Sequence, residues 1–324
     1  MDGLTARDAG FAAGLRGAIR GEVRESEPLA RYSTYRIGGP ATVVLPSSAE
    51  DVATVVRMAH EAGVPWFVLG LGSNILLPDE GLDALVIRLG KGLDRLDRDG
   101  DRWVLGAGLP APLAARKTAA AGYGGLHLFV GVPGTVGGGV YMNAGCHGGD
   151  WSEVVESVTV VDHAGRDAVV RRADIPFTYR RSGLEHRVVV ETAVRLRPEE
   201  QHRLTEQIGE MFEWRQSGTP FNQPCCGSVF KNPEGPSWKR EGGPRTAGQL
   251  IEAAGLKGAR VGGAEVSPMH ANYIVNTGGA TAGHVRGLIE QVRRRVEQEF
   301  GARLEPEVKV IGSRGEYLDL SVTP

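Results

Sequence analysis

A run rich in glycine offers the clearest chemistry in this sequence. Residues 131–145 read Gly-Val-Pro-Gly-Thr-Val-Gly-Gly-Gly-Val-Tyr-Met-Asn-Ala-Gly. Little side-chain bulk keeps a ligand away from such a main chain. Backbone N–H groups that have no other partner form a concave seat for an anion, such as a phosphate or diphosphate. Thr135 and Asn143 add hydrogen-bonding groups, so the run predicts an anion-binding loop; the alternative is a turn that packs against another element.

A second, shorter glycine segment covers residues 70–75 and follows a predicted strand at 66–69. A turn at the carboxyl end of a strand is where α/β sheets tend to bind ligands. Neither segment is a Walker A loop, because no lysine follows the glycines, and neither completes the Gly-x-Gly-x-x-Gly fingerprint. Together the two segments predict one large ligand that contains a diphosphate.

Three further places carry reactive groups but also allow a structural explanation. Ser228, Lys231 and Asn232 put a hydroxyl, a cation and an amide in one predicted turn, which could also be a loop leading into another domain. Arg180 lies in a predicted loop, where an arginine is usually only solvated. Glu307 stands at the mouth of a predicted strand, where glutamate is structural more often than catalytic.

The elements that would position these groups follow from hydrophobic periodicity. A helix is predicted from Ser48 to Gly63, with Asp51 placed as in a capping box. Pro198 suits the first turn of a helix that continues to about residue 216. The other predicted strands are 41–45, 84–89, 103–107, 188–196, 272–275 and 307–311, with a hairpin of 157–162 and 167–171; the other predicted helices are 112–121, 246–254 and 281–300.

Composition excludes several classes of protein. The chain has 324 residues and a formal net charge of −2. It therefore lacks the overall positive charge that would indicate nucleic acid or an anionic membrane as a partner. No apolar run is long enough to span a bilayer, and the first residues lack the apolar centre of a signal peptide. The cysteines number three, which argues against a disulfide framework and favours the cytoplasm.

Eight segments resemble the UDP-N-acetylenolpyruvoylglucosamine reductases, flavoenzymes that complete UDP-N-acetylmuramate in peptidoglycan precursor synthesis. The segment Tyr-Arg-Ile-Gly-Gly (35–39) and the two glycine segments alone would suit any FAD enzyme of the vanillyl-alcohol-oxidase fold. The segment Cys-Gly-Ser-Val-Phe-Lys-Asn-Pro (226–233), the Leu-Lys-Gly at 256–258 and the carboxy-terminal glutamate narrow the resemblance to this reductase. That glutamate, Glu307, lies in the segment Leu-Glu-Pro-Glu-Val at 304–308, and the remaining matching segments are 179–182 and His-Ala-Asn at 270–272.

The resemblance implies an α+β fold in which a two-subdomain FAD-binding module of the PCMH type precedes a smaller α+β substrate-binding domain. The expected parts are an N-terminal helical lead-in (1–30), the FAD-binding domain (31–197, with a break near residue 100) and the substrate-binding domain (198–324), whose C-terminal strand returns to the flavin. Arg180 and Ser228 are only 228 − 180 = 48 positions apart. This spacing leaves no room for an extra capping segment and indicates the shorter, type II class.

The resemblance also implies the site residues. The catalytic residues would be Arg180, Ser228 and Glu307. The substrate would be held by Tyr179, Lys231, Asn232, Lys257 and His270, although His270 could also be a core histidine. Non-covalent FAD would be bound by Gly70, Leu71, Gly72, Ser73, Asn74, Ile75, Val132, Pro133, Gly134, Thr135, Gly137, Gly138, Asn143 and Gly145, and no metal site is expected.

The implied reaction uses NADPH to reduce FAD, after which UDP-N-acetylglucosamine-enolpyruvate replaces NADPH in the same cleft. Hydride adds at C3 of the enolpyruvyl group and Ser228 delivers a proton to C2. A guanidinium stays charged and donates two parallel hydrogen bonds, which suits Arg180 to the charge that develops on the carboxylate. Glu307 would orient this group or, if protonated, donate to it. The protein is expected to be a monomer without nucleic acid or membrane partners.

Two departures from the family pattern matter. Cys146 and His147 stand where the family more often has Ala-Tyr, which could alter packing beside the flavin. They also keep open an FAD-linked oxidase of the same fold, in which oxygen is the acceptor and the flavin is often covalently attached to a histidine or cysteine. The stretch 234–244 is expanded and rich in glycine and proline.

Overall fold

The computed structural model describes residues 6, 8–233, 243 and 246–320. Apart from Gly243, the expanded stretch 234–244 lies outside the described residues. The chain divides into two compact units, and it crosses between them several times. The first unit comprises Met1–Glu27, Ala41–Leu71 and Asp83–Arg215, and the second comprises Pro28–Pro40, Gly72–Leu82 and Gln216–Pro324.

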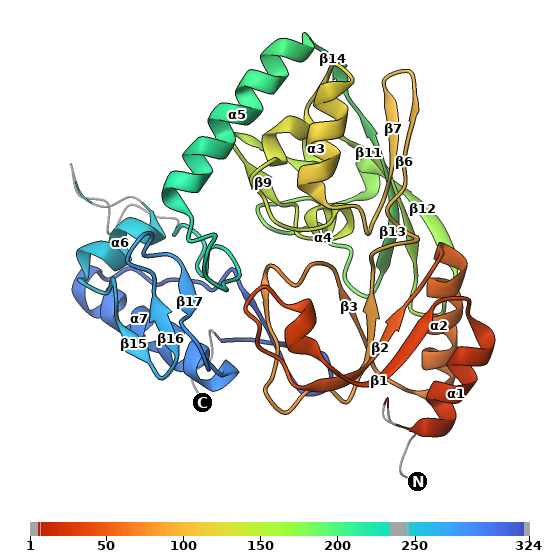
Figure 1. The fold of residues 1–324 in the computed structure, drawn as a ribbon, viewed down its shortest axis with the longest axis horizontal. Helices are drawn as coiled ribbons and strands as arrows, with labels where there is room; N and C mark the ends of the chain where they lie inside the picture. Colours follow the sequence, from red (N-terminus) through yellow and green to blue (C-terminus); the bar gives the residue numbers. More distant parts are fainter. Residues whose placement is uncertain (1–5, 7, 234–242, 244–245, 321–324) are drawn as a thin grey trace. The chain divides into compact units, whose positions relative to one another are not determined.

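The first unit opens with an α/β layer (Figure 1). Its four-stranded sheet has the order β1-β2-β5-β3, and both β2 and β3 run parallel to β5. The predicted strands 41–45, 66–69 and 84–89 are confirmed within a residue or two. The elements are α1 (Ala9–Ala18), β1 (Glu22–Pro28), β2 (Pro40–Leu45), α2 (Ala49–Ala62), β3 (Trp66–Leu69) and β5 (Leu85–Arg88).

Helix α2 begins and ends where its sequence predicts. Ser48 is the N-cap and accepts a hydrogen bond from the N–H of Asp51 at 3.1 Å, and Gly63 ends the helix in the left-handed conformation. The predicted capping box is only half formed, because the Asp51 carboxylate does not return to Ser48. It accepts instead from the N–H groups of Arg20 (3.1 Å), Gly21 (2.9 Å) and Ser47 (2.8 Å). Asp51 therefore ties the connection between α1 and β1 to the start of α2.

The second layer of this unit is a five-stranded antiparallel sheet of order β12-β11-β13-β7-β6. The predicted hairpin is confirmed: the N–H of Asp162 donates to the Arg166 carbonyl at 2.8 Å, and Asp162 Oδ1 accepts from the turn. The strands are β6 (Leu96–Asp99), β7 (Arg102–Gly106), β11 (Val155–Val161), β12 (Asp167–Arg171) and β13 (Val188–Arg195).

Helices and short strands complete the first unit. Helix α4 packs on β13 and β7. The prediction for Pro198 is wrong: Pro198 pairs with Tyr123 in a short strand ladder, and the helix starts only at Gln201. The elements are α3 (Ala111–Ala120), β8 (Tyr123–Gly124), α4 (Val136–Tyr141), β9 (Gly145–Cys146), β10 (Gly149–Asp150), β14 (Arg197–Pro198) and α5 (Gln201–Gly218), which continues into the second unit.

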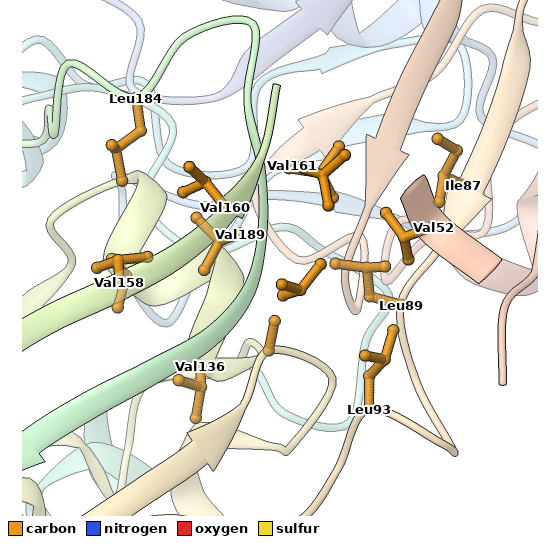
Figure 2. Close-up of a cluster of buried hydrophobic side chains, with 14 of the residues drawn as sticks. Val52, Ile87, Leu89, Leu93, Val136, Val158, Val160, Val161, Leu184 and Val189 are labelled. Atoms are coloured by element: carbon orange, nitrogen blue, oxygen red, sulfur yellow. The ribbon is translucent and has the colours of Figure 1, made fainter. Parts of the chain in front are cut away.

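One hydrophobic core joins these layers (Figure 2). Val52 from α2 and Ile87 from β5 belong to the same cluster as Val158 from β11, Val189 from β13 and Val136 at the start of α4. All five side chains are inaccessible to solvent or nearly so. Burial of one such side chain contributes about 1.5–3 kcal/mol, so Val136 anchors the glycine-rich run in the buried core of the unit.

The second unit is a smaller α+β assembly. One sheet has the order β15-β16-β17, and in the other β18 pairs with β19 and, in parallel, with β4. The predicted helices 246–254 and 281–300 are confirmed. The elements are β4 (Ile75–Leu76), α6 (Ala247–Ala253), β15 (Arg260–Val261), β16 (Ala264–Val266), β17 (Ile274–Asn276), α7 (Ala282–Phe300), β18 (Lys309–Ile311) and β19 (Tyr317–Leu318).

Helix α7 is anchored to an early part of the chain. Thr281 and His284 form its capping box, and the Asp79 carboxylate accepts the N–H of Ala282 at 2.9 Å. A carboxylate at this end is favoured by the helix dipole. The segment that follows β4 is thereby fixed within the second unit. Of the helices in the described ranges, none has the length and apolar character needed to cross a membrane.

Candidate active site

The two glycine segments meet in the first unit. Strand β3 delivers Gly70, and a Cβ atom added to Gly70 would lie 2.9 Å from Oγ1 of Thr135. A side chain at position 70 would therefore collide with the glycine-rich run. The close approach supports the prediction that both segments serve one ligand.

Much of the run's backbone is already hydrogen-bonded. Thr135 caps α4 and accepts the N–H of Gly138 at 3.2 Å, while Val136 and Gly137 donate to the carbonyls of Leu109 (2.8 Å) and Ala107 (2.9 Å). The expectation of unpartnered N–H groups is therefore wrong for residues 136–138. These residues form the first turn of α4, which docks onto the loop after β7.

The remaining donors lie just before this turn. Within the described chain, the N–H groups of Gly134 and Thr135 have no acceptor, and neither has that of Leu71. Gly134 is half-buried, and its φ of 155° is one that glycine adopts easily. Unpartnered N–H groups on both segments suit the oxygens of a diphosphate, so these residues fit the ligand that the sequence predicts.

Asn143 holds the run against the turn that carries Arg180. It is 2% exposed and adopts a positive φ of 42°. Its Nδ2 donates to the Thr178 carbonyl (3.0 Å) and to Asp150 Oδ2 (3.2 Å), and its Oδ1 accepts the N–H of Ser152 (3.1 Å). Both amide hydrogens thus bond groups of the protein itself, and in this structure the Asn143 side chain holds the turn in place.

Arg180 lies beside the end of the glycine-rich run. Thr178 and Arg181 close a tight turn through two backbone hydrogen bonds of 2.9 and 3.1 Å, and Arg180 has a φ of 58° within it. Its guanidinium donates to the Gly145 carbonyl at 3.2 Å and lies 4.8 Å from the ring centroid of Tyr179. The positive φ is uncommon for a residue with a side chain, and the contacts of the turn aim the charge at the run.

Ser228 and Glu307 come together in the second unit although they are 307 − 228 = 79 positions apart. We refer to residues 226–231 as the serine loop. The N–H of Glu307 donates to the Val229 carbonyl at 2.7 Å, and the N–H of Lys231 donates to the Glu305 carbonyl at 2.9 Å. The serine loop and the segment 305–307, which precedes β18, are therefore aligned in one register.

The shorter glycine segment also reaches this place, because it crosses into the second unit after Leu71. The Nδ2 of Asn74 donates to the Glu307 carbonyl at 3.2 Å, and the N–H of Lys309 donates to the Asn74 carbonyl at 3.0 Å. A Cβ on Gly227 would lie 3.9 Å from the Ser73 carbonyl. One of the segments predicted to bind the cofactor thus touches both Glu307 and the serine loop.

The hydroxyl of Ser228 makes no hydrogen bond to any other described residue. The thiol of Cys226, two positions earlier, is 2% exposed, and burial raises its pKa well above the ordinary value. Burial, and then the Cys226 thiol, likewise raise the pKa of the buried Tyr35. Cys226 and Tyr35 are therefore neutral near pH 7. The half-buried Ser228, which bonds no described residue, can form a hydrogen bond with a ligand.

The residues predicted to hold the substrate are engaged with near neighbours. Lys231 pairs with Glu305 (3.1 Å) and Lys257 with Glu252 on α6 (2.6 Å). Asn232 and His270 serve local structure: Asn232 accepts the N–H of Ala247 (3.1 Å), and His270 Nδ1 accepts the N–H of Asn272 (3.1 Å). Tyr179 lies beside the guanidinium of Arg180. Lys231 is part of the serine loop and Asn232 follows it directly, whereas the ion pair with Glu252 holds Lys257 beside α6.

The structure adds Asn272, which the sequence did not single out. Its amide bonds both backbone groups of Phe230, at 3.0 and 2.9 Å. The sequence signal that could have identified Asn272 is its place in the His-Ala-Asn segment. Hydrophobic periodicity does not predict hydrogen bonds between a side chain and a backbone that is distant in the sequence.

Cys146 and His147 lie beside the glycine-rich run in the first unit. The His147 ring packs edge-on against Trp214 of α5, with centroids 5.3 Å apart. Burial and the charge of Arg215 lower the pKa of His147, and Arg215 itself packs across Gly131. Cys146 is a free, half-buried thiol. The departure from the family pattern thus affects how α5 packs near the run.

Comparison with known proteins defines the class first. A family model described as an FAD binding domain matches residues 40–170, so the chain is an FAD-containing flavoprotein, and its α+β fold class is confirmed. A second model, the C-terminal domain of UDP-N-acetylenolpyruvoylglucosamine reductase, matches residues 219–311. The chain belongs to the UDP-N-acetylenolpyruvoylglucosamine reductase family, as its motifs indicated.

Relatives match along almost their whole length. The reductase of Bacillus velezensis is 39% identical over 92% of this chain and 97% of its own. That of Bacillus subtilis is 38% identical over 90% of this chain and 95% of its own. The crystal structure of the Thermus caldophilus reductase (MurB) superposes with a TM-score of 0.76 at 35% identity, covering 90% of this chain and 99% of that one.

Proposed function

We propose that this protein reduces the enolpyruvyl group of UDP-N-acetylglucosamine-enolpyruvate to give UDP-N-acetylmuramate, with NADPH as donor and FAD as cofactor. The single observation that carries the proposal is the hydrogen bond from Glu307 to Val229, which aligns Glu307 with the serine loop. These residues lie in the part of the chain that matches the reductase C-terminal domain. The reaction supplies a precursor of peptidoglycan.

The glycine segments would hold FAD. Leu71, Gly134 and Thr135 offer backbone N–H groups to its diphosphate, because these groups have no acceptor in the described chain. Gly70 keeps a side chain out of this space. When bound, FAD accepts a hydride equivalent from NADPH and passes it to C3 of the enolpyruvyl group.

Arg180 would bind the carboxylate of the enolpyruvyl group. Negative charge develops on this carboxylate as the double bond is reduced. A guanidinium remains charged at all relevant pH values and matches a carboxylate with two parallel hydrogen bonds. The turn that Asn143 holds keeps the Arg180 guanidinium in a fixed orientation before the substrate binds. A charge fixed in advance stabilises the transition state without the cost of reorganisation.

Ser228 would give its proton to C2, and Glu307 would orient the enolpyruvyl group or donate to it. A serine hydroxyl is a weak acid, so water or a neighbouring group must restore its proton. Lys231, Asn232, Lys257, His270 and Tyr179 are proposed to bind the UDP-sugar, with lysine suited to the diphosphate. The domain limits, a cytoplasmic location and a monomeric state remain predictions.

Visible absorption of the purified protein tests the proposal. We expect a flavin spectrum that bleaches with NADPH in the absence of oxygen and recovers when the enolpyruvyl substrate is added. Recovery only with oxygen would contradict the proposal and favour the oxidase. Denaturation should release FAD into the supernatant, whereas flavin that stays on the protein would indicate a covalent link.

A further inference from the structure

The side chain of Asn272 takes the place of a neighbouring strand for one residue of the serine loop. The N–H of Phe230 donates to Asn272 Oδ1 at 3.0 Å, and Asn272 Nδ2 donates to the Phe230 carbonyl at 2.9 Å. The N–H of Val229 donates to the backbone carbonyl of Asn272 at 2.9 Å. Asn272 is only 5% exposed, so water does not compete well for these bonds.

The opposite edge of the serine loop explains why Phe230 needs another partner. There Phe230 and Pro306 form an antiparallel bridge, flanked by bonds from the N–H of Glu307 to the Val229 carbonyl and from the N–H of Lys231 to the Glu305 carbonyl. In a pair flanked in this way the two facing residues exchange no hydrogen bond, and their own N–H and C=O groups point away from each other's segment. The backbone groups of Phe230 are therefore directed to the edge where the Asn272 side chain bonds them.

We propose that Asn272 is a positioning residue for the proton transfer: its side-chain amide fixes both backbone groups of Phe230, two residues after Ser228, and thereby keeps the Ser228 hydroxyl in register with Glu307. The inference rests on the proposed function, in which Ser228 protonates C2. Ser228 has no hydrogen bond of its own to the described residues, so the orientation of its hydroxyl depends on the backbone around it. Asn272 touches neither the proton nor the substrate in this proposal.

The chemistry of the amide makes the proposal testable with pH. An amide donates from Nδ2 and accepts at Oδ1 in one plane. An ionised aspartate at this position accepts but cannot donate, and it would face the Phe230 carbonyl. A protonated aspartic acid donates and accepts as the amide does. Burial raises the pKa of an aspartic acid, so Asn272→Asp can be switched between the two forms within a range that a folded enzyme tolerates.

The experiment measures the two half-reactions of the FAD-loaded enzyme by stopped flow. For Asn272→Asp at about pH 8, we expect flavin reduction by NADPH to stay within about twofold of wild type. Reoxidation by the enolpyruvyl substrate should slow by about 10²-fold, the usual consequence of misplacing a reacting group by an ångström. On lowering the pH to about 5.5, most of this loss should be recovered relative to wild type at the same pH.

Asn276→Asp is the matched control. Asn276 lies on the adjacent β17, and its side chain bonds the Tyr35 carbonyl (3.0 Å) and the N–H groups of Gly278 (2.9 Å) and Ala280 (3.1 Å). The same charge is introduced four positions along the chain, at a side chain whose hydrogen bonds go to Tyr35, Gly278 and Ala280 and to no residue of the serine loop. Comparison at each pH also removes the titration of the nearby His270, Lys231 and Glu307, which all three proteins share.

The outcomes separate this inference from the proposed function. If wild type bleaches with NADPH but is not reoxidised by the enolpyruvyl substrate, the proposed function fails. If wild type completes both half-reactions and Asn272→Asp does so at wild-type rates at pH 8, the positioning role is refuted. Equal slowing of both half-reactions, or a loss that low pH does not reverse while the flavin spectrum stays native, would also refute it.

Discussion

At the scale of single residues, Ser228 offers the most direct test of the chemistry. Its hydroxyl bonds no other described residue, while hydrogen bonds of Val229 to Glu307 and Asn272 hold the backbone beside it. Ser228→Ala should therefore leave the fold and the NADPH half-reaction intact. Reoxidation by the enolpyruvyl substrate should slow by about 10²-fold or more, the usual worth of a positioned general acid.

Stopped-flow absorbance of the flavin gives both rates for Ser228→Ala. Ser313→Ala, at an exposed position of the same unit, is the matched control and should behave as wild type. Equal slowing of the two half-reactions in Ser228→Ala would remove Ser228 from the role of acid.

At the scale of elements, the turn that carries Arg180 depends on Asn143. Asn143→Gly and Asn143→Ala both remove three hydrogen bonds to Asp150, Ser152 and Thr178. Each should destabilise the protein by about 2–4 kcal/mol, because buried groups lose their partners. Asn143 has a φ of 42°, which glycine adopts without strain, so the alanine variant should be less stable by about a further 1 kcal/mol. Denaturant unfolding measures both; equal stabilities would show that the backbone relaxes.

Helix α2 is held to α1 by a carboxylate whose stability contribution depends on pH. Burial alone would raise the pKa of Asp51, but the hydrogen bonds from Ser47, Arg20 and Gly21 outweigh it and lower the pKa. A carboxyl whose folded pKa lies below its unfolded pKa stabilises the protein above the unfolded value, and this stabilisation is lost as the pH falls through the folded value.

Asp51→Asn should therefore be less stable than wild type at neutral pH. The difference in unfolding free energy should shrink as the pH falls below about 4. Denaturant unfolding of both proteins at several pH values checks this. A difference that stays constant down to pH 3 would mean that the charge of Asp51 is not what the surrounding N–H groups stabilise.

At the scale of the whole molecule, the proposed chemistry is divided between the two units. The glycine-rich run and Arg180 belong to the first, whereas Ser228 and Glu307 belong to the second. If Arg180 and Glu307 act on one substrate group, their losses should not add. Arg180→Ala combined with Glu307→Ala should cost clearly less activation free energy than the sum of the single changes. Strict additivity with native flavin spectra would show that the two residues act independently.

The resemblance also predicts the kinetic order of the whole enzyme. One flavin serves NADPH and the enolpyruvyl substrate in turn, so initial-rate plots should be parallel, as in a ping-pong mechanism. Each substrate should inhibit at high concentration, because it then occupies the flavin state that belongs to the other. Double-reciprocal plots whose lines intersect to the left of the vertical axis would indicate a ternary complex instead.

The sequence alone determined the elements and the family. Periodicity located α2, α6 and α7 within a residue or two, and Ser48 and Gly63 also marked the ends of α2. Helix starts can be predicted in this way because Ser48, Thr246 and Thr281 cap these helices through local contacts. The motifs identified the reductase family because eight short segments match it in order along nearly the whole chain. Local signals misled at Pro198, where pairing with Tyr123 in a strand ladder prevailed over helix preference.

Only the tertiary structure decided which groups are already used and which remain available. The N–H groups of Val136 and Gly137 donate to the loop after β7, and the Asn143 amide donates to the turn that carries Arg180. The approach of Glu307 to the serine loop, and the support that Asn272 gives this loop, join segments far apart in the chain. Such pairings depend on how the elements pack against one another, and local sequence patterns do not predict contacts between distant segments.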